Sequence, residues 1–388
     1  MLTETVYLDH SATTPMDDRV LAVMEPYFSE FFGNPSSLHR QGQRAEAAVS
    51  AARQSVASIL GCSAGSIFFT ACATESNNLV LHGLAITKRD AGQAYHALTT
   101  PIEHPSVIEP LRHIQSHGAG AYSFLPVDRA GKLRAAEYRQ LVTDEISLVS
   151  IVLGNNEIGT INPISEVGDF LKHKPALLHT DAVQAANFIE LDVDKLGVDF
   201  LTLSPHKFYG PKGVGILYAR DPASITPLMQ GGSQESGVRP GTHNVPLIVG
   251  AAKALELAQA AHQDESTRLR PLRDRLIHEV LRRIPECELT GDPEDRLPHH
   301  ASFVFADIDS NELLASLDLH GYACSSGSAC KVGNPEPSKL LLALGYSENL
   351  ASGALRVTLG KSSSAGVIDA FLNTLIDVIG RLRNQEAD

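Results

Sequence analysis

Polar side chains stand directly after several apolar runs of the kind that form buried strands. Lys207 follows one run beside glycines that allow close approach, and a desolvated lysine amine forms Schiff bases with carbonyl cofactors. Asp181 follows another run, where a carboxylate can pair with a ring cation and Gln184 can donate a hydrogen bond nearby. Thr74 opens a helical pattern whose free backbone N–H groups suit a phosphate, and Asn156 ends a further run.

Each of these residues also has a purely structural explanation. Thr74 or Asp181 can cap a helix, and Lys207 can be a solvated surface residue. The amides of Asn155 and Asn156 can stabilise a turn or reach a ring oxygen. The combination is more specific, because a phosphate cradle, a Schiff-base lysine, an acidic partner for a pyridinium nitrogen and amides beside a phenol oxygen are what pyridoxal phosphate requires. The sequence therefore predicts a pyridoxal phosphate site.

Short apolar runs alternate with helical patterns, such as 75–87 and 165–174, over much of the chain. This alternation is typical of βαβ units, and uninterrupted apolar runs are typical of strands covered on both faces. Open α/β sheets bind ligands at the carboxyl ends of their strands, so the residues above are expected to meet at one edge. The predicted strands are 67–70, 94–99, 148–153, 176–179, 200–203 and 215–218.

We predict an α/β protein with two domains and an N-terminal segment, 1–15, that packs with either. Residues 16–245 form the large cofactor-binding domain, a mostly parallel sheet flanked by helices, and 246–388 form a smaller α+β domain. The range 246–283 is typical of one long helix or two, which Pro271 should kink or split. The other elements expected in the smaller domain are strands 301–306 and 355–358, helices 310–320 and 365–382, and a flexible loop of small residues, 324–334.

The composition excludes several classes of protein. The 388 residues include 45 acidic and 32 basic side chains, and the net charge of −13 disfavours direct binding to nucleic acid. A hydrophobic content of 43% excludes a mainly disordered chain. The apolar runs are shorter than the ~18 residues of a membrane span, and the N-terminus lacks a signal-peptide pattern. Five cysteines do not suggest a disulfide framework, so we expect a globular cytoplasmic protein without membrane contact.

The metal and nucleotide motifs are incomplete. The glycines of 210–215 lack the dinucleotide-binding spacing, and 360–362 lacks the earlier glycine of a P-loop. His113 and His117 are four residues apart, but a solvated helix face explains them better than a metal. The pair His299–His300 lies in a Pro-flanked segment that is predicted to be a surface loop. We therefore predict no metal site.

A wider pattern comes from nine segments: YLDHSATTP (7–15), GNPSSLH (33–39), ATESNN (73–78), EHPSV (103–107), NNEIGT (155–160), HTDAVQ (179–184), SPHKFYGPKGVG (204–215), RPGTHN (239–244) and SSGSAC (325–330). Together they resemble cysteine desulfurases, in the NifS/IscS-like group of the class V aminotransferase superfamily with PLP fold type I. The likeness extends from Tyr7 to about Leu382. The SSGSAC loop is its most specific part, because it distinguishes this group from relatives with a shorter loop.

The resemblance implies a role for most of the residues above. Lys207 would hold pyridoxal phosphate covalently, Asp181 would pair with its pyridine nitrogen, and His104 would stack on its ring and help to move protons. Gln184 and Asn156 would lie on the phenolate side. The residues implied to bind the phosphate are Ala73, Thr74, Ser204 and His206, together with the partner subunit's Thr242, which implies a homodimer.

The implied reaction is removal of sulfur from L-cysteine. Arg356, with Asn156, would bind the substrate carboxylate, and Lys207 would remove the α-proton. Cys330 would take the sulfur as a persulfide, with Lys331 favouring its thiolate, and leave L-alanine. The sulfur would pass to an acceptor protein for iron–sulfur cluster assembly, tRNA thiolation or DNA sulfur modification, and Cys330 would at most be a transient iron–sulfur ligand. The cysteines interpreted as structural are Cys62, Cys72, Cys287 and Cys324.

Other functions remain open from the sequence. Selenocysteine lyases and aminotransferases use the same fold, whereas a non-enzymatic sulfur-relay protein would use Cys330 alone. An aminotransferase needs no loop cysteine, and a relay protein needs no cofactor site. The chain departs from the family pattern at Cys72 and Pro205, beside the cofactor residues. Its short C-terminal tail leaves open whether it docks on an iron–sulfur scaffold protein.

Overall fold

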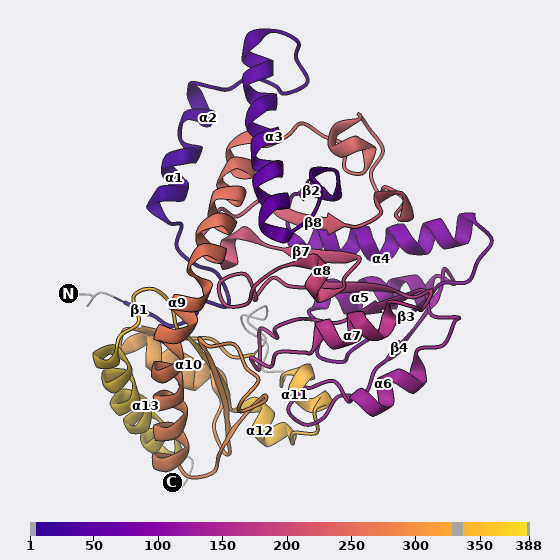
Figure 1. The fold of residues 1–388 in the computed structure, drawn as a ribbon. Helices are drawn as coiled ribbons and strands as arrows, with labels where there is room; N and C mark the ends of the chain where they lie inside the picture. Colours follow the sequence, from indigo (N-terminus) through magenta and orange to yellow (C-terminus); the bar gives the residue numbers. More distant parts are fainter. Residues whose placement is uncertain (1–4, 328–336, 386–388) are drawn as a thin grey trace.

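The computed structural model describes residues 5–327 and 337–385, and a large sheet lies at its centre (Figure 1). The strand order is β2-β8-β7-β6-β5-β3-β4. β8 runs antiparallel to both of its neighbours, and the other strands run in one direction, so their carboxyl ends share an edge. The strands are β2 (Ile67–Thr70), β3 (His96–Thr99), β4 (Ala121–Phe124), β5 (Leu148–Ser150), β6 (Leu177–Asp181), β7 (Phe200–Leu203) and β8 (Gly215–Ala219).

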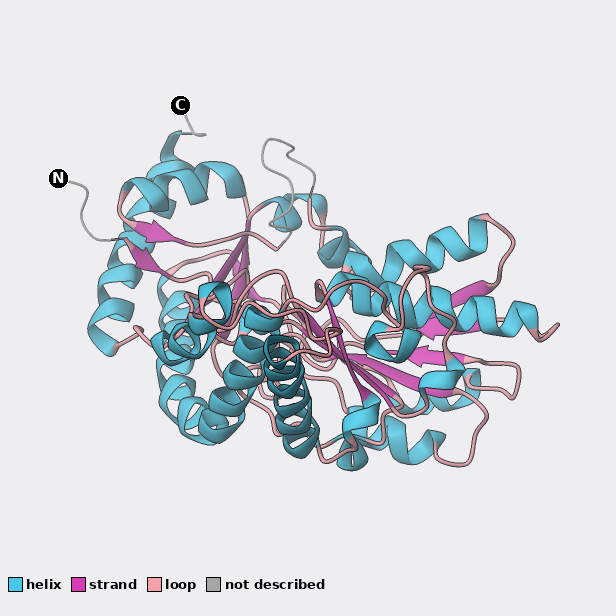
Figure 2. Cartoon of the chain, turned by 90° about the horizontal axis from the view of Figure 1, so that it is seen from above, coloured by secondary structure: helices cyan, strands magenta, loops and turns pink. Residues whose placement is uncertain are grey.

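Helices cover both faces of this sheet (Figure 2). One apolar cluster joins the sheet to α3, α7, α8 and the first part of α9, and another joins it to α4 and α5. The helices of this part are α1 (Asp18–Met24), α2 (Pro26–Ser29), α3 (Arg40–Leu60), α4 (Ala73–Asp90), α5 (Pro105–Ser116), α6 (Ala135–Leu141), α7 (Ile164–Leu171), α8 (Val193–Leu196) and α9 (Val245–Arg283).

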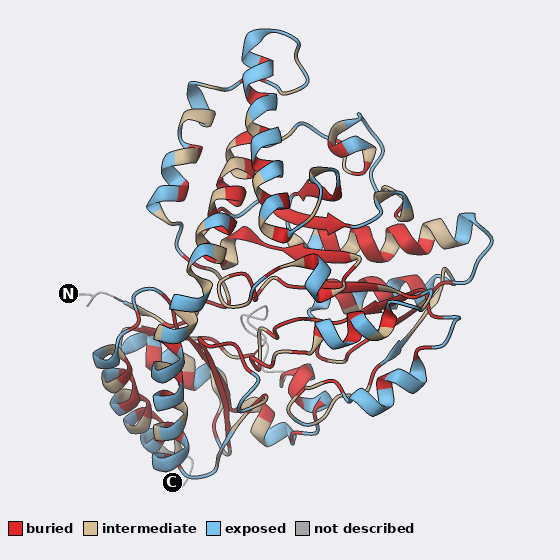
Figure 3. Ribbon diagram, in the orientation of Figure 1, coloured by how far each residue is buried: buried red, intermediate tan, exposed pale blue. Residues whose placement is uncertain are grey.

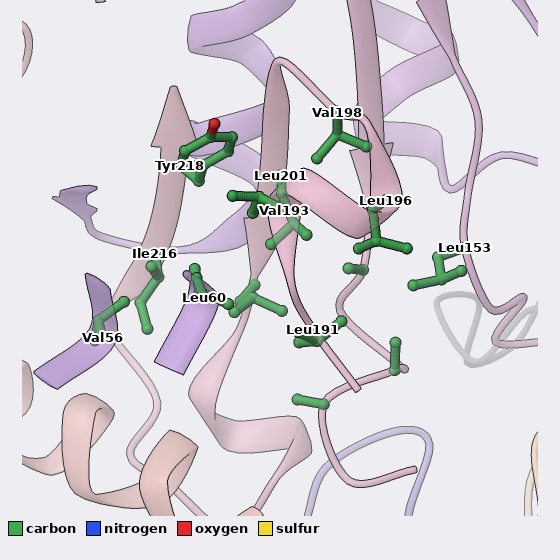
Figure 4. Packing of buried hydrophobic residues seen from close by; sticks show 14 of the residues in the cluster. Val56, Leu60, Leu153, Leu191, Val193, Leu196, Val198, Leu201, Ile216 and Tyr218 are labelled. Atoms are coloured by element: carbon green, nitrogen blue, oxygen red, sulfur yellow. The ribbon is translucent and has the colours of Figure 1, made fainter. Parts of the chain in front are cut away.

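The strands are apolar on both sides, which explains their uninterrupted apolar sequence. Along β2, Ile67 and Phe69 join the cluster with α3, whereas Phe68 joins the cluster with α4. Successive side chains of a strand point to opposite faces, so a single run supplies both layers. The sheet is accordingly buried along most of its length (Figure 3), and Leu60 of α3 and Leu201 of β7 belong to the same packed group (Figure 4).

A smaller sheet, β12-β10-β9, is antiparallel and packs with α10, α13 and the second part of α9. The N-terminal segment joins this body, because β1 pairs in parallel with β11 and Leu8 is buried in its core. The first and last described residues of the chain lie beside this body (Figure 1). The elements are β1 (Val6–Tyr7), β9 (Cys287–Leu289), β10 (His300–Phe305), β11 (Tyr322–Ala323), β12 (Ala354–Thr358), α10 (Ser310–Leu319), α11 (Lys339–Ala343), α12 (Glu348–Ser352) and α13 (Ala365–Gln385).

The long helix α9 continues through Pro271, so the alternative of two separate helices is wrong. Its residues up to Ala258 pack in the core of the large sheet, and those from Leu269 onward pack in the smaller core. A proline in a helix interior costs about 3 kcal/mol. Burial on both sides of Pro271 outweighs this cost.

The predicted fold class, a mixed α/β protein with a mostly parallel sheet, is confirmed. The sequence did not predict β4, because this edge strand is half exposed and lacks an apolar run. The strand predicted at 215–218 exists as β8 but runs against its neighbours. The division at residue 245 stays a prediction. In the described part of the chain, no helix combines the length and the apolar character that crossing a membrane requires.

Candidate active site

Predicted site residues lie at or just after the carboxyl ends of five strands of the large sheet. Thr74 follows β2, His104 follows β3, and Asn156 follows β5. Asp181 ends β6, and Lys207 closes a short 3-10 turn after β7. These strands run in the same direction, so residues that are far apart in the sequence lie at the same edge of the sheet. Open α/β sheets bind ligands at this edge.

The amine of Lys207 is held by backbone carbonyls of the N-terminal segment. Its Nζ donates to the carbonyl oxygens of Ser11 and Ala12, each at 2.7 Å. Gln184 Nε2 donates to the same Ser11 carbonyl at 2.9 Å. A solvated surface role for Lys207 is therefore wrong. The sequence did not indicate Ser11 or Ala12, since a backbone carbonyl has no signature in the residue type.

Asp181 is buried and receives a hydrogen bond at each carboxylate oxygen. The N–H of Val183 donates to Oδ1 at 3.1 Å, and Asn77 Nδ2 donates to Oδ2 at 2.9 Å. Asn77, on α4, was not predicted as a site residue. These bonds fix the orientation of the carboxylate, as a partner of a ring cation requires.

His104 is exposed at the site and is the N-cap residue of α5. Its Nδ1 accepts from the N–H of Ser106 at 3.1 Å and lies 2.7 Å from Ser106 Oγ. Desolvation lowers the pKa of His104, while Asp181 opposes this shift and Lys207 adds to it. His104 thus interacts electrostatically with both Asp181 and Lys207.

The N-terminus of α4 is shaped for an anion. Its N-cap is Cys72, so Thr74 lies inside the helix, with Ala73 as the first helical residue. Within the described chain no side chain caps α4, and the capping role considered for Thr74 is wrong. Gly215 of β8 lies against this turn, where a Cβ would stand 2.5 Å from the carbonyl carbon of Cys72. Uncapped N–H groups at a helix N-terminus suit a phosphate.

His206 is a neutral imidazole beside Lys207. Its Nδ1 lies 3.1 Å from Thr13 Oγ1, and its carbonyl accepts from Thr14. Burial lowers the pKa of His206 to about 4, and the charges of Lys207 and Lys212 add to the decrease. A neutral His206 can serve a phosphate as a hydrogen-bond donor rather than as a charge.

The other two residues predicted to bind the phosphate differ in exposure. Ser204 is buried directly after β7. Thr242 is exposed on the segment before α9, where a neighbouring subunit could be reached. Its role at the partner's site stays a prediction.

Arg356 connects three parts of the chain from β12. Its guanidinium donates to Asp9 Oδ1 at 2.7 Å and to the carbonyl oxygen of Asn156 at 3.0 Å. Its buried Nε has no hydrogen-bond partner among the described residues. The structural alternative, an ion pair between segments, is therefore realised through Asp9. Within residues 5–327 and 337–385, the Nε–H of Arg356 is left without an acceptor.

The two neighbouring asparagines have different roles. The side chain of Asn155 stabilises the turn, because its Nδ2 donates to the carbonyl of Ile102 and its Oδ1 accepts from the N–H groups of Glu157 and Ile158. Asn156 lies at the site and offers its carbonyl oxygen to Arg356.

Two predicted site residues, Cys330 and Lys331, lie outside the described residues. Of the other cysteines, Cys324 is partly buried, and desolvation raises its pKa well above the usual range. Cys72 is exposed at the turn before α4, so its interpretation as a packed structural residue is wrong. The sequence could not show this exposure, because a turn made of small residues can be either buried or exposed.

The prediction that His299–His300 is a surface loop is wrong. Both rings are buried, because His299 stacks on Phe188 and His300 begins the central strand β10. Burial lowers the pKa of both far below the usual value. In residues 5–327 and 337–385, no cluster of three or more His, Cys, Asp or Glu side chains is arranged to hold a metal ion.

The fold and this edge of the sheet define a class of protein, since the family model described as aminotransferase class-V matches residues 6–371. The chain belongs to this family. Within it, cysteine desulfurase IscS of Methanosarcina thermophila is 42% identical over 379 residues, 98% of this chain and 93% of the relative. A solved NifS-like protein gives a TM-score of 0.90 at 37% identity, covering 97% of this chain and 99% of that one. SspA in complex with cysteine gives 0.79 at 33% identity, covering 92% and 99%.

Membership of this family implies pyridoxal phosphate, and the residues at the sheet edge fit it. The donor set includes the Lys207 amine, the Asp181 carboxylate and the uncapped N-terminus of α4. Two buried polar atoms, Asn77 Oδ1 and Arg356 Nε, have no partner among the described residues. Buried polar groups are normally satisfied, so these atoms suit a site that a bound group completes.

Proposed function

We propose that this chain is a cysteine desulfurase that uses pyridoxal phosphate to convert L-cysteine into L-alanine and transfers the sulfur to Cys330. The observation that carries the proposal is the meeting of Lys207, Asp181 and His104 beside the uncapped N-terminus of α4. Relatives named cysteine desulfurase IscS support the reaction, and the solved complex of SspA with cysteine supports the substrate.

The residues at the sheet edge divide the work. Lys207 holds the cofactor covalently and moves the α-proton, with the Ser11 and Ala12 carbonyls positioning its amine. Bound pyridoxal phosphate supplies an electron sink for the charge that the proton leaves behind. Arg356 binds the substrate carboxylate, for which a planar guanidinium is suited.

The sulfur step requires a thiol. The Cys330 thiolate attacks the sulfur of L-cysteine, and an S–S bond forms as the substrate Cβ–S bond breaks. One L-cysteine and one thiol give one L-alanine and one persulfide, so the step needs no external oxidant. The persulfide then passes to an acceptor protein. This use of Cys330 separates a desulfurase from an aminotransferase.

The assembly around this site stays predicted. In the homodimer, the partner subunit's Thr242 reaches the phosphate, and the exposure of Thr242 is compatible with that role. The sulfur-acceptor protein and the cytoplasmic location are likewise predictions.

The first experiment records the visible spectrum of the purified protein before and after L-cysteine, while alanine and sulfide are assayed with a thiol reductant present. We expect a yellow protein whose band changes as both products appear in equal amounts. Cys330→Ser should keep the colour and lose sulfide, whereas Cys287→Ser, a half-buried control, should keep both. A yellow protein without sulfide would contradict the desulfurase reaction. A protein that stays colourless after addition of pyridoxal phosphate would contradict the site.

A further inference from the structure

His104 caps α5, and this role restricts which nitrogen of the His104 ring can carry a proton. His104 has extended backbone angles (φ −60°, ψ 147°), and its Nδ1 accepts from the N–H of Ser106 at 3.1 Å. A backbone N–H can only donate, so Nδ1 presents its lone pair and the neutral ring carries its proton on Nε2. Ser106 Oγ lies 2.7 Å from the same Nδ1, and therefore its hydroxyl also donates.

The Ser106 hydroxyl is joined to Asp181 through Asn77. Asn77 Nδ2 lies 2.9 Å from Ser106 Oγ and 2.9 Å from Asp181 Oδ2. A carboxylate only accepts, so the amide nitrogen faces both groups and each of its two hydrogens has an acceptor. Ser106, Asn77 and Asp181 are buried, whereas His104 is exposed at the site. The donor and the acceptor are thus assigned in every hydrogen bond that joins these residues.

We propose that Asn77 and Ser106 are positioning residues that hold His104 as the Nε2–H tautomer and connect it to Asp181. The tautomer itself does not depend on the proposed function. Only the identity of the groups that His104 faces, when cofactor and substrate are bound, rests on that function. His104 then offers an N–H donor, not a lone pair, to the groups bound there. Removal of the substrate α-proton falls to Lys207.

The titratable groups around His104 are consistent with this tautomer. Asp181, at the end of β6, and Lys207, in the turn after β7, both act on its charge. The carboxyl group of Glu103 is engaged elsewhere, since its Oε1 accepts from Thr100 Oγ1 and from the N–H of Val152. The other titratable side chains of the pocket that His104 lines, between α4 and α5, are His82, Glu109 and His113.

Nitrogen NMR of the full-length, pyridoxal phosphate-loaded protein with ¹⁵N-labelled histidine tests the tautomer, and His104→Gln assigns the signal. We expect an unprotonated Nδ1 and a protonated Nε2 from about pH 7 to about pH 8. Ser106→Thr, which keeps a hydroxyl, should retain this form. Ser106→Ala removes the hydroxyl donor but keeps the backbone N–H that donates to Nδ1, so it should shift the signal only part of the way toward a mixture of tautomers. Asn77→Ala, which leaves the Ser106 hydroxyl without its own donor, should give a smaller shift in the same direction, and Ser116→Ala, at the far end of α5, should give none. A protonated Nδ1 in the unmodified protein would overturn the proposal.

Kinetics give a second readout. Ser106→Ala should lower kcat about 3- to 10-fold, the effect of one lost hydrogen bond, and leave the KM for L-cysteine nearly unchanged. A rate and a tautomer that both stay as in the unmodified protein would overturn the role of Ser106. If the chain catalyses a different reaction, sulfide is absent but the tautomer is still measurable. The two failures are therefore distinguishable.

Discussion

At the scale of single residues, the reactive groups depend on neighbours that carry no catalytic signature. Backbone carbonyls hold the Lys207 amine, and Asp9 holds the Arg356 guanidinium. Side-chain type and position singled out the lysine for Schiff-base chemistry, and the family resemblance singled out the arginine for carboxylate binding. It did not identify what orients them. Two predictions follow from buried ionisable groups at this scale.

Arg356→Lys should raise the KM for L-cysteine about 10- to 100-fold with a smaller change in kcat, because a lysine has no planar fork to share among Asp9, Asn156 and a substrate carboxylate. Steady-state kinetics measure the effect. Arg19→Lys, an exposed arginine paired with Asp17, is the control. An unchanged KM would show that Arg356 is only an ion-pair partner.

Glu103→Gln should make stability less dependent on pH. Burial raises the pKa of Glu103 from 4.5 to about 8, so the folded protein keeps a proton that the unfolded chain releases. The stability that this carboxyl contributes is complete below about pH 4.5 and is lost as the pH rises through 8. Melting temperatures across this window should therefore fall less for Glu103→Gln than for the unmodified protein. Glu46→Gln, on the surface, is the control and should follow the unmodified protein. If the melting temperature of Glu103→Gln also fell in parallel with that of the unmodified protein, the buried proton would be refuted.

At the scale of elements, the anion site is made by α4 and β8 together. The turn before α4 is pressed against Gly215, and β8 enters the sheet between β2 and β7 against their direction. The sequence indicated the helix start and the glycine separately. It did not show that they touch, because a strand predicted from its apolar run has no direction until its partners are known.

Gly215→Ala should lower the free energy of unfolding by about 1–3 kcal/mol and weaken pyridoxal phosphate binding, because the added Cβ displaces the Cys72 turn. Denaturant unfolding and cofactor titration measure the two effects. Gly366→Ala is a matched control, since a Cβ there meets nothing within 4 Å. Normal cofactor affinity in Gly215→Ala would show that the close contact does not shape the site.

At the scale of the whole molecule, α9 and the N-terminal segment connect the two cores. α9 passes from one core to the other, and the N-terminal segment pairs with the smaller body at β1 before its Ser11 and Ala12 carbonyls reach Lys207. The lysine site therefore depends on how the smaller body is packed. Two substitutions in α9, made in the whole protein, can test the stability of that packing.

Leu276→Ala should lower the free energy of unfolding by about 2–5 kcal/mol, because Leu276 is fully buried in the smaller core. Leu281→Ala on the same helix should cost far less, since Leu281 is 42% exposed. Denaturant unfolding measures both variants. Equal decreases in the free energy of unfolding would contradict the buried position of Leu276 and the exposed position of Leu281.

The sequence by itself determined the fold class and pointed to the cofactor class, and it predicted the reactive residues. Buried strands have recognisable apolar runs, and parallel strand ends meet at one edge, so Lys207 and Asp181 could be placed together without coordinates. Their chemistry depends on side-chain type, which a sequence states directly.

Only the tertiary structure decided how these groups are held. Ser106 and Asn77 belong to different helices, and Asp9 and Arg356 lie at opposite ends of the chain, so no local pattern predicts their contacts. Burial was equally hidden, as the enclosed His299 and the exposed Cys72 show. The physical reason is that burial and hydrogen bonding between distant segments depend on how the elements pack, whereas sequence patterns report what lies within one element.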